Sequence, residues 1–263
     1  MTNKPIRGTF EWAVANVNCC TGCSHDCRYC YARHNAIDRF HKVQAGQWTT
    51  MKPLNEVPAR ARRHYDGTVM FPTTHDITPE IYSICGRTLN ALLTAGNTVL
   101  VVSKPHLIVV QAMCRDFADY KGKILFRFTI GCDDSTILSY WEPGAPDFDE
   151  RFASLCCAYT EGFQTSVSVE PMLDSPNIVR HVQRMQDFVT DAIWIGKLNH
   201  INQRVKVETD EDRMQVQRIC DGQTDTRIRE IYESLKDNPK VKWKESVKEV
   251  VGLPLPQQPG EDM

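Results

Sequence analysis

Three cysteines lie within a stretch of eight residues near the start of the sequence. Cys23, Cys27 and Cys30 are separated by three residues and then by two, so one loop can place three thiolates around a single inorganic centre. A structural zinc site usually takes four ligands from two separated pairs, and no second such pair follows. Three thiolates would leave one iron of a 4Fe-4S cluster without a protein ligand. This spacing favours a catalytic metal centre. The alternative is a structural zinc or iron site.

The remaining cysteines of the 11 in the chain have a simpler interpretation. Cys19 and Cys20 precede the three spaced thiols and are competing candidates for metal binding, but the spacing favours Cys23, Cys27 and Cys30. Five more lie in helix-like segments, where cysteine is typically a small buried hydrophobic residue. These are at positions 85, 114, 156, 157 and 220.

The composition gives the protein no net positive charge that would attract nucleic acid. The net charge is -2 and the pI about 6.4, so binding to nucleic acid would need a local basic groove. No apolar run approaches the roughly 18 residues of a membrane span, and Met1–Pro5 lacks the apolar core of a signal peptide. We therefore expect a cytoplasmic protein with reduced thiols and no membrane partner.

The string from Gly22 to Arg33 resembles the signature of the radical S-adenosylmethionine (SAM) superfamily, C-x3-C-x-aromatic-C, with Tyr29 as the aromatic residue. More narrowly, it is similar to the branch that contains spore photoproduct lyase. In that family the open iron of a 4Fe-4S cluster binds the amine and carboxylate of SAM. An electron from an external flavodoxin- or ferredoxin-type donor then splits SAM into methionine and a 5'-deoxyadenosyl radical, which abstracts hydrogen from a substrate. The resemblance covers about residues 11–200, and it implies such an enzyme with an unassigned substrate.

Apolar runs alternate with helical patterns along most of the chain. Strands are predicted at 11–18, 68–71, 98–102, 125–130, 166–169 and 192–196, with a weak one at 241–243. The alternation predicts an α/β fold with parallel strands, but by itself fits either an open doubly wound sheet or a barrel. The resemblance implies a partial (β/α)6 TIM-like barrel over residues 1–200. Residues 201–263 are then a C-terminal helical extension with a mobile tail.

Polar residues follow the predicted strands, where ligands collect in parallel α/β folds. The resemblance implies that Thr74 and Asp76 meet the methionyl amine of SAM, that Lys104 pairs with its carboxylate, and that Thr129 lies near its ribose. Other candidate cofactor-binding residues at strand ends are Ser103, Glu142, Arg151 and Glu170, with Glu142 and Arg151 matching a Glu...Arg pair of this branch. Each could instead be a surface cap or an ion pair.

One departure from the branch concerns hydrogen donation. Spore photoproduct lyase carries a hydrogen-donating cysteine where this sequence has Thr74. The resemblance therefore does not imply that this chain acts on the substrate of that repair enzyme. Cys132, directly after the strand predicted at 125–130, is the best alternative donor, although it could simply fill space in a turn.

Two other functions compete with a radical SAM enzyme of unassigned substrate. A DNA-repair lyase that acts on a pyrimidine photoproduct or a modified nucleobase is suggested by the branch and by five arginines. These are Arg33, Arg39, Arg60, Arg62 and Arg63. The second alternative is a non-catalytic binding module that a metal stabilises.

Overall fold

A curved parallel sheet of seven strands forms the centre of the computed structural model, which describes residues 5–263. All neighbouring strands are parallel. In spatial order the strands are β1 (Ala15–Asn16), β4 (Thr68–Phe71), β5 (Thr98–Ser103), β6 (Ile124–Thr129), β7 (Gln164–Val169), β8 (Ile193–Ile195) and β9 (Val241–Trp243). The two remaining strands, β2 (Cys20–Thr21) and β3 (Lys52–Pro53), form a small antiparallel pair.

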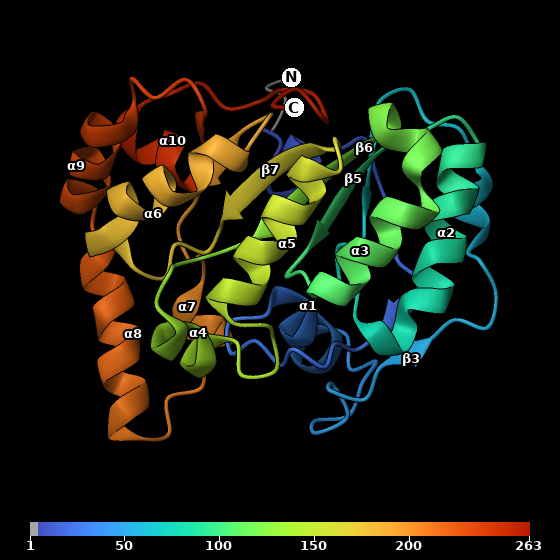
Figure 1. Cartoon of the computed structure of the whole chain (residues 1–263). Coiled ribbons are helices and arrows are strands. Elements are labelled where there is room, and N and C mark those ends of the chain that lie inside the picture. The colour runs from blue at the N-terminus through green and yellow to red at the C-terminus, as the bar shows by residue number, and fades with distance from the viewer. Residues whose placement is uncertain (1–4) are drawn as a thin grey trace.

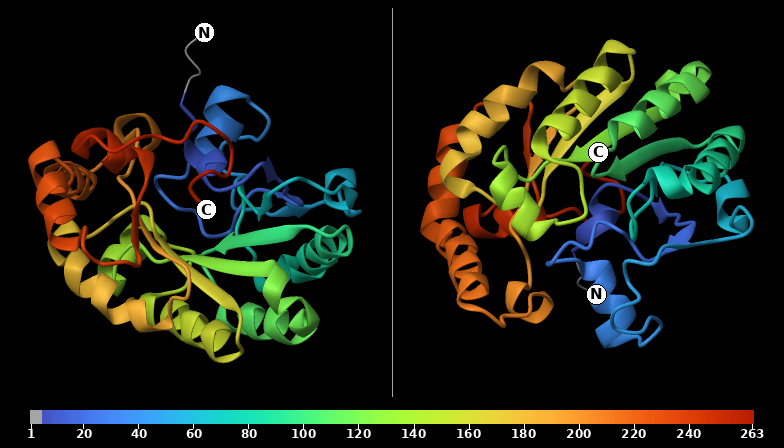
Figure 2. Two further views of the ribbon diagram at one scale, coloured as in Figure 1. Left: turned by 90° about the horizontal axis from the view of Figure 1, so that it is seen from above. Right: turned by 60° about the horizontal axis from the view of Figure 1, so that its bottom comes forward.

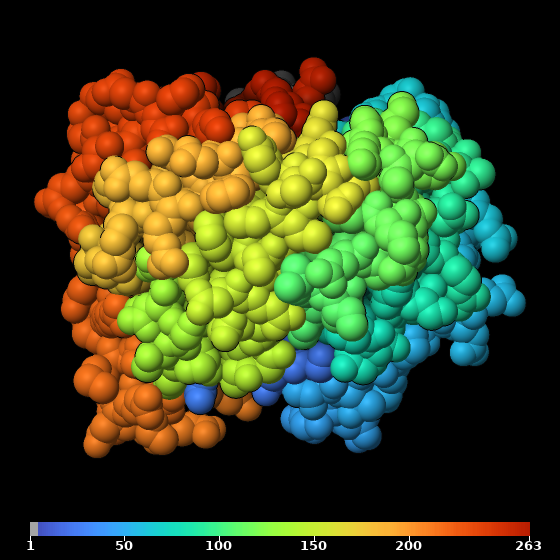
Figure 3. Space-filling model, in the orientation of Figure 1, coloured from blue at the N-terminus to red at the C-terminus, as the bar shows by residue number. Residues whose placement is uncertain are grey.

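Most of the helices lie on the outer face of the sheet, and the C-terminal tail lies on its inner side (Figures 1 and 2). In space-filling view they form a continuous layer over this face (Figure 3). The helices are α1 (Tyr31–His34), α2 (Tyr82–Thr94), α3 (Leu107–Asp116), α4 (Ser135–Trp141), α5 (Phe148–Thr160), α6 (Ile178–Met185), α7 (Ile201–Arg204), α8 (Asp210–Gly222), α9 (Asp225–Leu235) and α10 (Glu245–Val251). Among the described residues no helix is long and apolar enough to cross a membrane.

Both faces of the sheet are buried, which explains the continuous apolar runs in the sequence. Alternate residues such as Val99 and Phe126 belong to the main core beneath the helices. The opposite residues, including Leu100 and Leu125, pack with Trp12 in a separate inner cluster. Because successive side chains of a strand point to opposite faces, the inner face is left to form the walls of a cavity.

The prediction of a partial TIM-like barrel is confirmed, with one addition. The weak strand at 241–243 is β9, and it pairs in parallel with β8 through Ile193–Val241. The domain boundary predicted at residue 200 therefore falls between two neighbouring strands of one sheet. Among the described residues, β1 and β9 are not paired with each other, so the barrel is incomplete.

The gap between β1 and β9 is covered by the two ends of the chain. A 3-10 helix, Gly8–Glu11, precedes β1, where the sequence predicted the start of a strand. The C-terminal tail, expected to be mobile, is hydrogen-bonded to this segment through Gly260 N to Phe10 O at 2.8 Å and Asp262 N to Glu11 O at 3.1 Å. The segment Met1–Pro5, for which the sequence predicts no signal peptide, lies mostly outside the described residues.

Candidate metal and cofactor site

The three spaced cysteines line one cavity of about 800 Å³ at the C-terminal ends of the strands. Cys23 and Cys27 are buried and Cys30 is partly exposed. The loop that carries them runs from β2 to α1, and Cys30 is the N-cap of α1. A volume of this size is in the range of small-molecule sites.

Two glycines allow other segments to approach this loop closely. A Cβ atom on Gly22 would lie 2.6 Å from the carbonyl oxygen of Trp48, and one on Gly144 would lie 2.2 Å from that of Ser24. Gly22 also has a φ of +89°, which is strained for other residues. The cysteine loop is therefore held between backbone segments on two sides.

Burial makes all three thiols hard to ionise in the metal-free protein. It raises the pKa of Cys23 to about 12, with a further contribution from the Asp76 charge. It also raises the pKa of Cys27 well above the usual value and that of Cys30 in the same direction. Buried thiolates need a compensating positive charge, which a metal centre supplies when it displaces the thiol protons.

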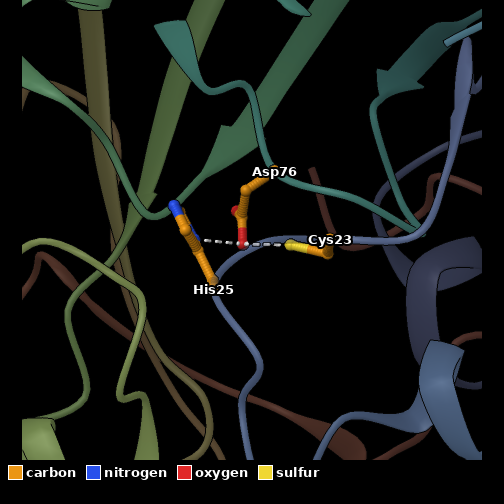
Figure 4. A group of neighbouring side chains, drawn as sticks. All are labelled: Cys23, His25 and Asp76. Carbon is orange, nitrogen blue, oxygen red and sulfur yellow. Dashed lines mark hydrogen bonds and ion pairs between the residues drawn. The ribbon is translucent and has the colours of Figure 1, made fainter. Parts of the chain in front are cut away.

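Asp76 is the centre of a hydrogen-bond network beside Cys23 (Figure 4). Its Oδ1 accepts from Lys104 N at 2.7 Å and from Ser103 Oγ at 3.0 Å. Its Oδ2 lies 2.8 Å from His25 Nδ1 and 3.7 Å from Cys23 Sγ. Burial alone would raise the pKa of Asp76, but Lys104 and His25 outweigh it and hold that pKa well below its usual range.

Cys23, His25 and Asp76 offer ligand atoms within 4.8 Å of one another, yet this group does not resemble a vacant metal site. Each Asp76 oxygen already has hydrogen-bonding partners, and His25 has contacts on both ring nitrogens. Its Nε2 lies 2.9 Å from His106 Nε2. We interpret the group as the network that holds the cysteine loop against the segment after β4.

Lys104 is a buried cation that faces the thiols. Its Nζ lies 3.7 Å from Asp76 Oδ2 and 5.8 Å from the centre of the Tyr29 ring. Burial opposes its charge, but Asp76, Cys27 and other groups raise its pKa well above the usual value. Its side chain is 12% exposed, and it lines the cavity.

Three other predicted cofactor residues line the same cavity: Thr74, Thr129 and Glu170. The backbone N–H of Thr74 donates to Asn18 Oδ1 at 2.9 Å, which fixes the segment after β4. Burial raises the pKa of Glu170. These residues lie at the C-terminal ends of β4, β6 and β7, as expected of a ligand site in a parallel sheet.

Ser103, Glu142 and Arg151 are not among the residues that line the cavity. The Ser103 hydroxyl donates a hydrogen bond to Asp76 Oδ1. Glu142 and Arg151 form an ion pair with both side chains fully buried, and Glu142 accepts a hydrogen bond from the Tyr29 hydroxyl. The geometry gives these residues supporting roles, because they position Asp76 and Tyr29 rather than face the cavity.

Cys132 does not line the cavity either. It is 1% exposed, and its thiol lies 3.5 Å from the carbonyl oxygen of Asp134. The structure therefore gives no support to Cys132 as a hydrogen donor, and it fits the simpler interpretation of a residue that fills a turn. Cys19 and Cys20 are also absent from the lining. The Cys19 sulfur lies 3.6 Å from that of Cys85.

Sequence reasoning missed a charged group on the opposite wall of the cavity. Lys244 Nζ lies 2.7 Å from Glu11 Oε1, 3.5 Å from Glu245 Oε2 and 3.7 Å from Glu170 Oε2. It also lies 3.9 Å above the centre of the Trp12 ring. Only the parallel pairing of β9 brings Lys244 here, so the one available signal was the weak strand at 241–243.

A cluster with three protein ligands fits this site. The donor set is three buried thiols on one loop, and such soft ligands suit iron–sulfur clusters. Lys104 adds a positive charge beside them, and the cavity extends well beyond the cysteines. No residue of the described chain provides a fourth cysteine in the lining.

No protein-family model matches the sequence, and no curated protein matches it. Among solved structures, SuiB from Streptococcus suis bound to S-adenosylmethionine is similar, with a TM-score of 0.57, 12% identity, and coverage of 94% of this chain and 54% of SuiB. Spore photoproduct lyase, as a mutant with dinucleoside spore photoproduct, matches with a TM-score of 0.52, 15% identity, and coverage of 92% and 79%. Both are radical SAM enzymes.

The chain shares its fold with these two proteins. SuiB bound to its precursor peptide SuiA gives a similar match, with a TM-score of 0.57 and 12% identity over 92% of this chain. The chain spans about half the length of SuiB. At these low identities the similarity extends to the fold only. It assigns no role to individual residues of this chain.

Proposed function

We propose that the protein is a radical SAM enzyme in which Cys23, Cys27 and Cys30 hold a 4Fe-4S cluster. The observation that carries this proposal is that the three thiols line one cavity together with Lys104 and Asp76. A structural knot would need no such cavity beside its metal. The wider radical SAM fold is consistent with it.

When bound, the cluster supplies an electron, obtained from a flavodoxin- or ferredoxin-type donor, that cleaves SAM to methionine and a 5'-deoxyadenosyl radical. The chain's own residues bind and orient SAM. Lys104 offers a cation to the SAM carboxylate, and Thr74 and Asp76 offer acceptors near the amine. Thr129, which pairs with Ser168 of β7, extends the polar lining.

Asp76 has two tasks in this arrangement. Its Oδ1 is taken up by Lys104 N and Ser103 Oγ, so this oxygen orients the segment after β5. Its side chain remains 13% exposed. Asp76 thus fixes Lys104, and its Oδ2, which already lies 2.8 Å from His25 Nδ1, has a second lone pair that can meet a ligand ammonium.

The test is anaerobic reconstitution with iron and sulfide, followed by iron analysis, visible absorption and measurement of 5'-deoxyadenosine after reduction with SAM present. We expect iron uptake and SAM cleavage in the wild type. The Cys27→Ala variant should lose both, and Cys20→Ala should keep both, because Cys20 is buried outside the cavity lining. Binding of zinc alone, with no iron uptake, would reject the proposal in favour of a structural metal module.

The five arginines that suggested a nucleic-acid substrate do not line the cavity. Arg39, Arg60, Arg62 and Arg63 are exposed, and none lines the cavity. Arg33 is paired with Asp26 at 3.0 Å. These arginines therefore form no basic groove that leads into the site.

A further inference from the structure

Several buried polar atoms on the inner face of the sheet have no hydrogen-bond partner among the described residues. They are Trp12 Nε1, Asn16 Oδ1, Arg127 Nη1, Trp194 Nε1 and Glu245 Oε2. Trp12, Asn16 and Glu245 also line the cavity. A buried polar atom without a hydrogen-bond partner destabilises the folded protein. Trp48 Nε1 is unpaired as well and lies in the lining near Cys23, but Asn16 and Glu245 are the residues that present unpaired acceptors to the cavity. A ligand with hydrogen-bond donors would complete the part of the cavity that these two residues line.

Three carboxyl groups surround one ammonium on this wall. Lys244 Nζ lies 2.7, 3.7 and 3.5 Å from oxygens of Glu11, Glu170 and Glu245. Burial raises the pKa of Glu11 to about 8 and also raises that of Glu170. One cation is therefore too little to keep all three carboxyl groups ionised. A cationic ligand would supply the missing positive charge and favour their ionised forms.

Glu245 and Glu170 have unused acceptor capacity. The Glu245 side chain is 9% exposed, and its Oε2 has only the ion pair with Lys244 and no hydrogen bond. Within the described chain, Glu170 lies 3.7 Å from Lys244 and has no hydrogen bond of 3.5 Å or less. A Cβ atom on Gly196 would lie 3.0 Å from carbons of both Glu170 and Lys244. The glycine thus leaves space for these side chains to lie together.

The other cations of this wall lie farther out. Arg7 pairs with Glu249, and Lys197 lies 3.9 Å from Asp225. Arg204 lines the cavity, and no carboxylate of the described residues lies within 4.0 Å of it. A ligand that places a positive group against the carboxylates should therefore present a neutral or anionic end toward Arg204.

We propose that the wall formed by Asn16, Glu170 and Glu245 binds the substrate through a cationic group rich in N–H donors, such as a guanidinium or an amine. Calling this ligand the substrate rests on the proposed radical SAM function. The binding itself depends on the three acceptors and on the three carboxyl groups that share Lys244. It needs neither an iron–sulfur cluster nor SAM.

The experiment is isothermal titration of the full chain with L-arginine and with L-citrulline, as purified and after anaerobic reconstitution. The two probes have the same length and both carry a carboxylate, but only L-arginine has a guanidinium. We expect L-arginine to bind at least about tenfold more tightly, because two charge-assisted hydrogen bonds replace neutral ones. Equal affinity for the two probes, or no binding of L-arginine, would overturn the proposal.

Two variants locate the binding. Glu245→Gln should remove the preference for L-arginine, while Glu249→Gln on the same helix should keep it, because Glu249 is 42% exposed and already paired with Arg7. If Glu245→Gln lowers the melting temperature markedly, Glu170→Gln replaces it. If Glu245→Gln and Glu249→Gln reduced the preference for L-arginine equally, the assignment of the site to Glu245 would be wrong.

A third variant separates this site from the cofactor end of the cavity. Asp76→Asn should leave the affinity for L-arginine unchanged, and a loss there would place the probe beside the cysteines and refute the inference. The outcomes also separate the two proposals. A chain that binds L-arginine but takes up no iron would retain this site and reject the radical SAM function. Iron uptake and SAM cleavage without any preference for L-arginine would do the reverse.

Discussion

Gly144 is the position where a single methyl group should disturb the cysteine loop most directly. A Cβ atom there would lie 2.2 Å from Ser24 O and 3.1 Å from His25 Cα. Ordinary carbon–oxygen contacts begin at about 3.3 Å, so the two segments must separate by about 1 Å in Gly144→Ala. The separation would also break the hydrogen bond from Gly144 N to His25 O, which is 3.0 Å long.

The cost can be estimated from these contacts. Overpacking of this kind typically costs about 1–3 kcal/mol, and the lost backbone hydrogen bond adds about 1 kcal/mol. We expect Gly144→Ala to lower the free energy of unfolding by about 2–4 kcal/mol. Metal sites tolerate deviations of only about 0.2 Å in ligand distance, so iron uptake should fall as well.

Denaturant unfolding measures the first effect and iron analysis after reconstitution the second. The matched control is Gly122→Ala, because a Cβ atom on Gly122 would meet nothing within 4 Å. That control should stay within about 0.5 kcal/mol of the wild type. The reasoning would be refuted if Gly144→Ala unfolded at the same denaturant concentration as Gly122→Ala and bound as much iron.

Three further predictions concern charge and ligation. Cys30→Ala should abolish 5'-deoxyadenosine formation, measured by chromatography, and full activity in this variant would remove Cys30 from the ligand set. Lys104→Met should weaken SAM binding about tenfold to a hundredfold in equilibrium titrations, since a charge-assisted hydrogen bond contributes roughly 1.5–3 kcal/mol, whereas an unchanged dissociation constant would make Lys104 structural. Burial raises the pKa of Glu11 from 4.5 to about 8, so the folded state favours its protonated form. Stability from this group is complete below about pH 4.5 and is lost as the pH rises through about 8. Glu11→Gln should flatten this dependence in unfolding experiments at several pH values, and an unaltered pH profile would contradict the shift.

Elements whose environment shows in the local sequence pattern could be predicted without the structure. The strands at 98–102 and 125–130 are buried on both faces, and a continuous apolar run records that environment directly. The cysteine spacing likewise predicted a single ligand-bearing loop, because three thiols so close in sequence cannot lie far apart in space. Thr74, Lys104 and Glu170 could be named as candidates because strand ends in a parallel sheet meet at one edge.

Tertiary structure alone decided which polar residues face the cavity. Glu142 and Arg151 follow a strand just as Lys104 does, yet they turn inward to pair with each other behind Tyr29. Cys132 occupies a comparable position in sequence, but its thiol is buried in a turn. A position at the end of a strand determines the edge of the sheet at which a residue lies. The direction of its side chain depends on contacts with distant segments.

The opposite wall of the cavity depends most on long-range contacts. Glu11 and Lys244 are at opposite ends of the sequence, and the contact between them forms only because β9 pairs with β8 and the N-terminal segment covers the gap beside β1. The short, polar-flanked strand at 241–243 carries little local signal, since its burial comes from that pairing and not from its own pattern. The cluster loop could therefore be predicted from the sequence, whereas the proposed substrate wall required the folded chain.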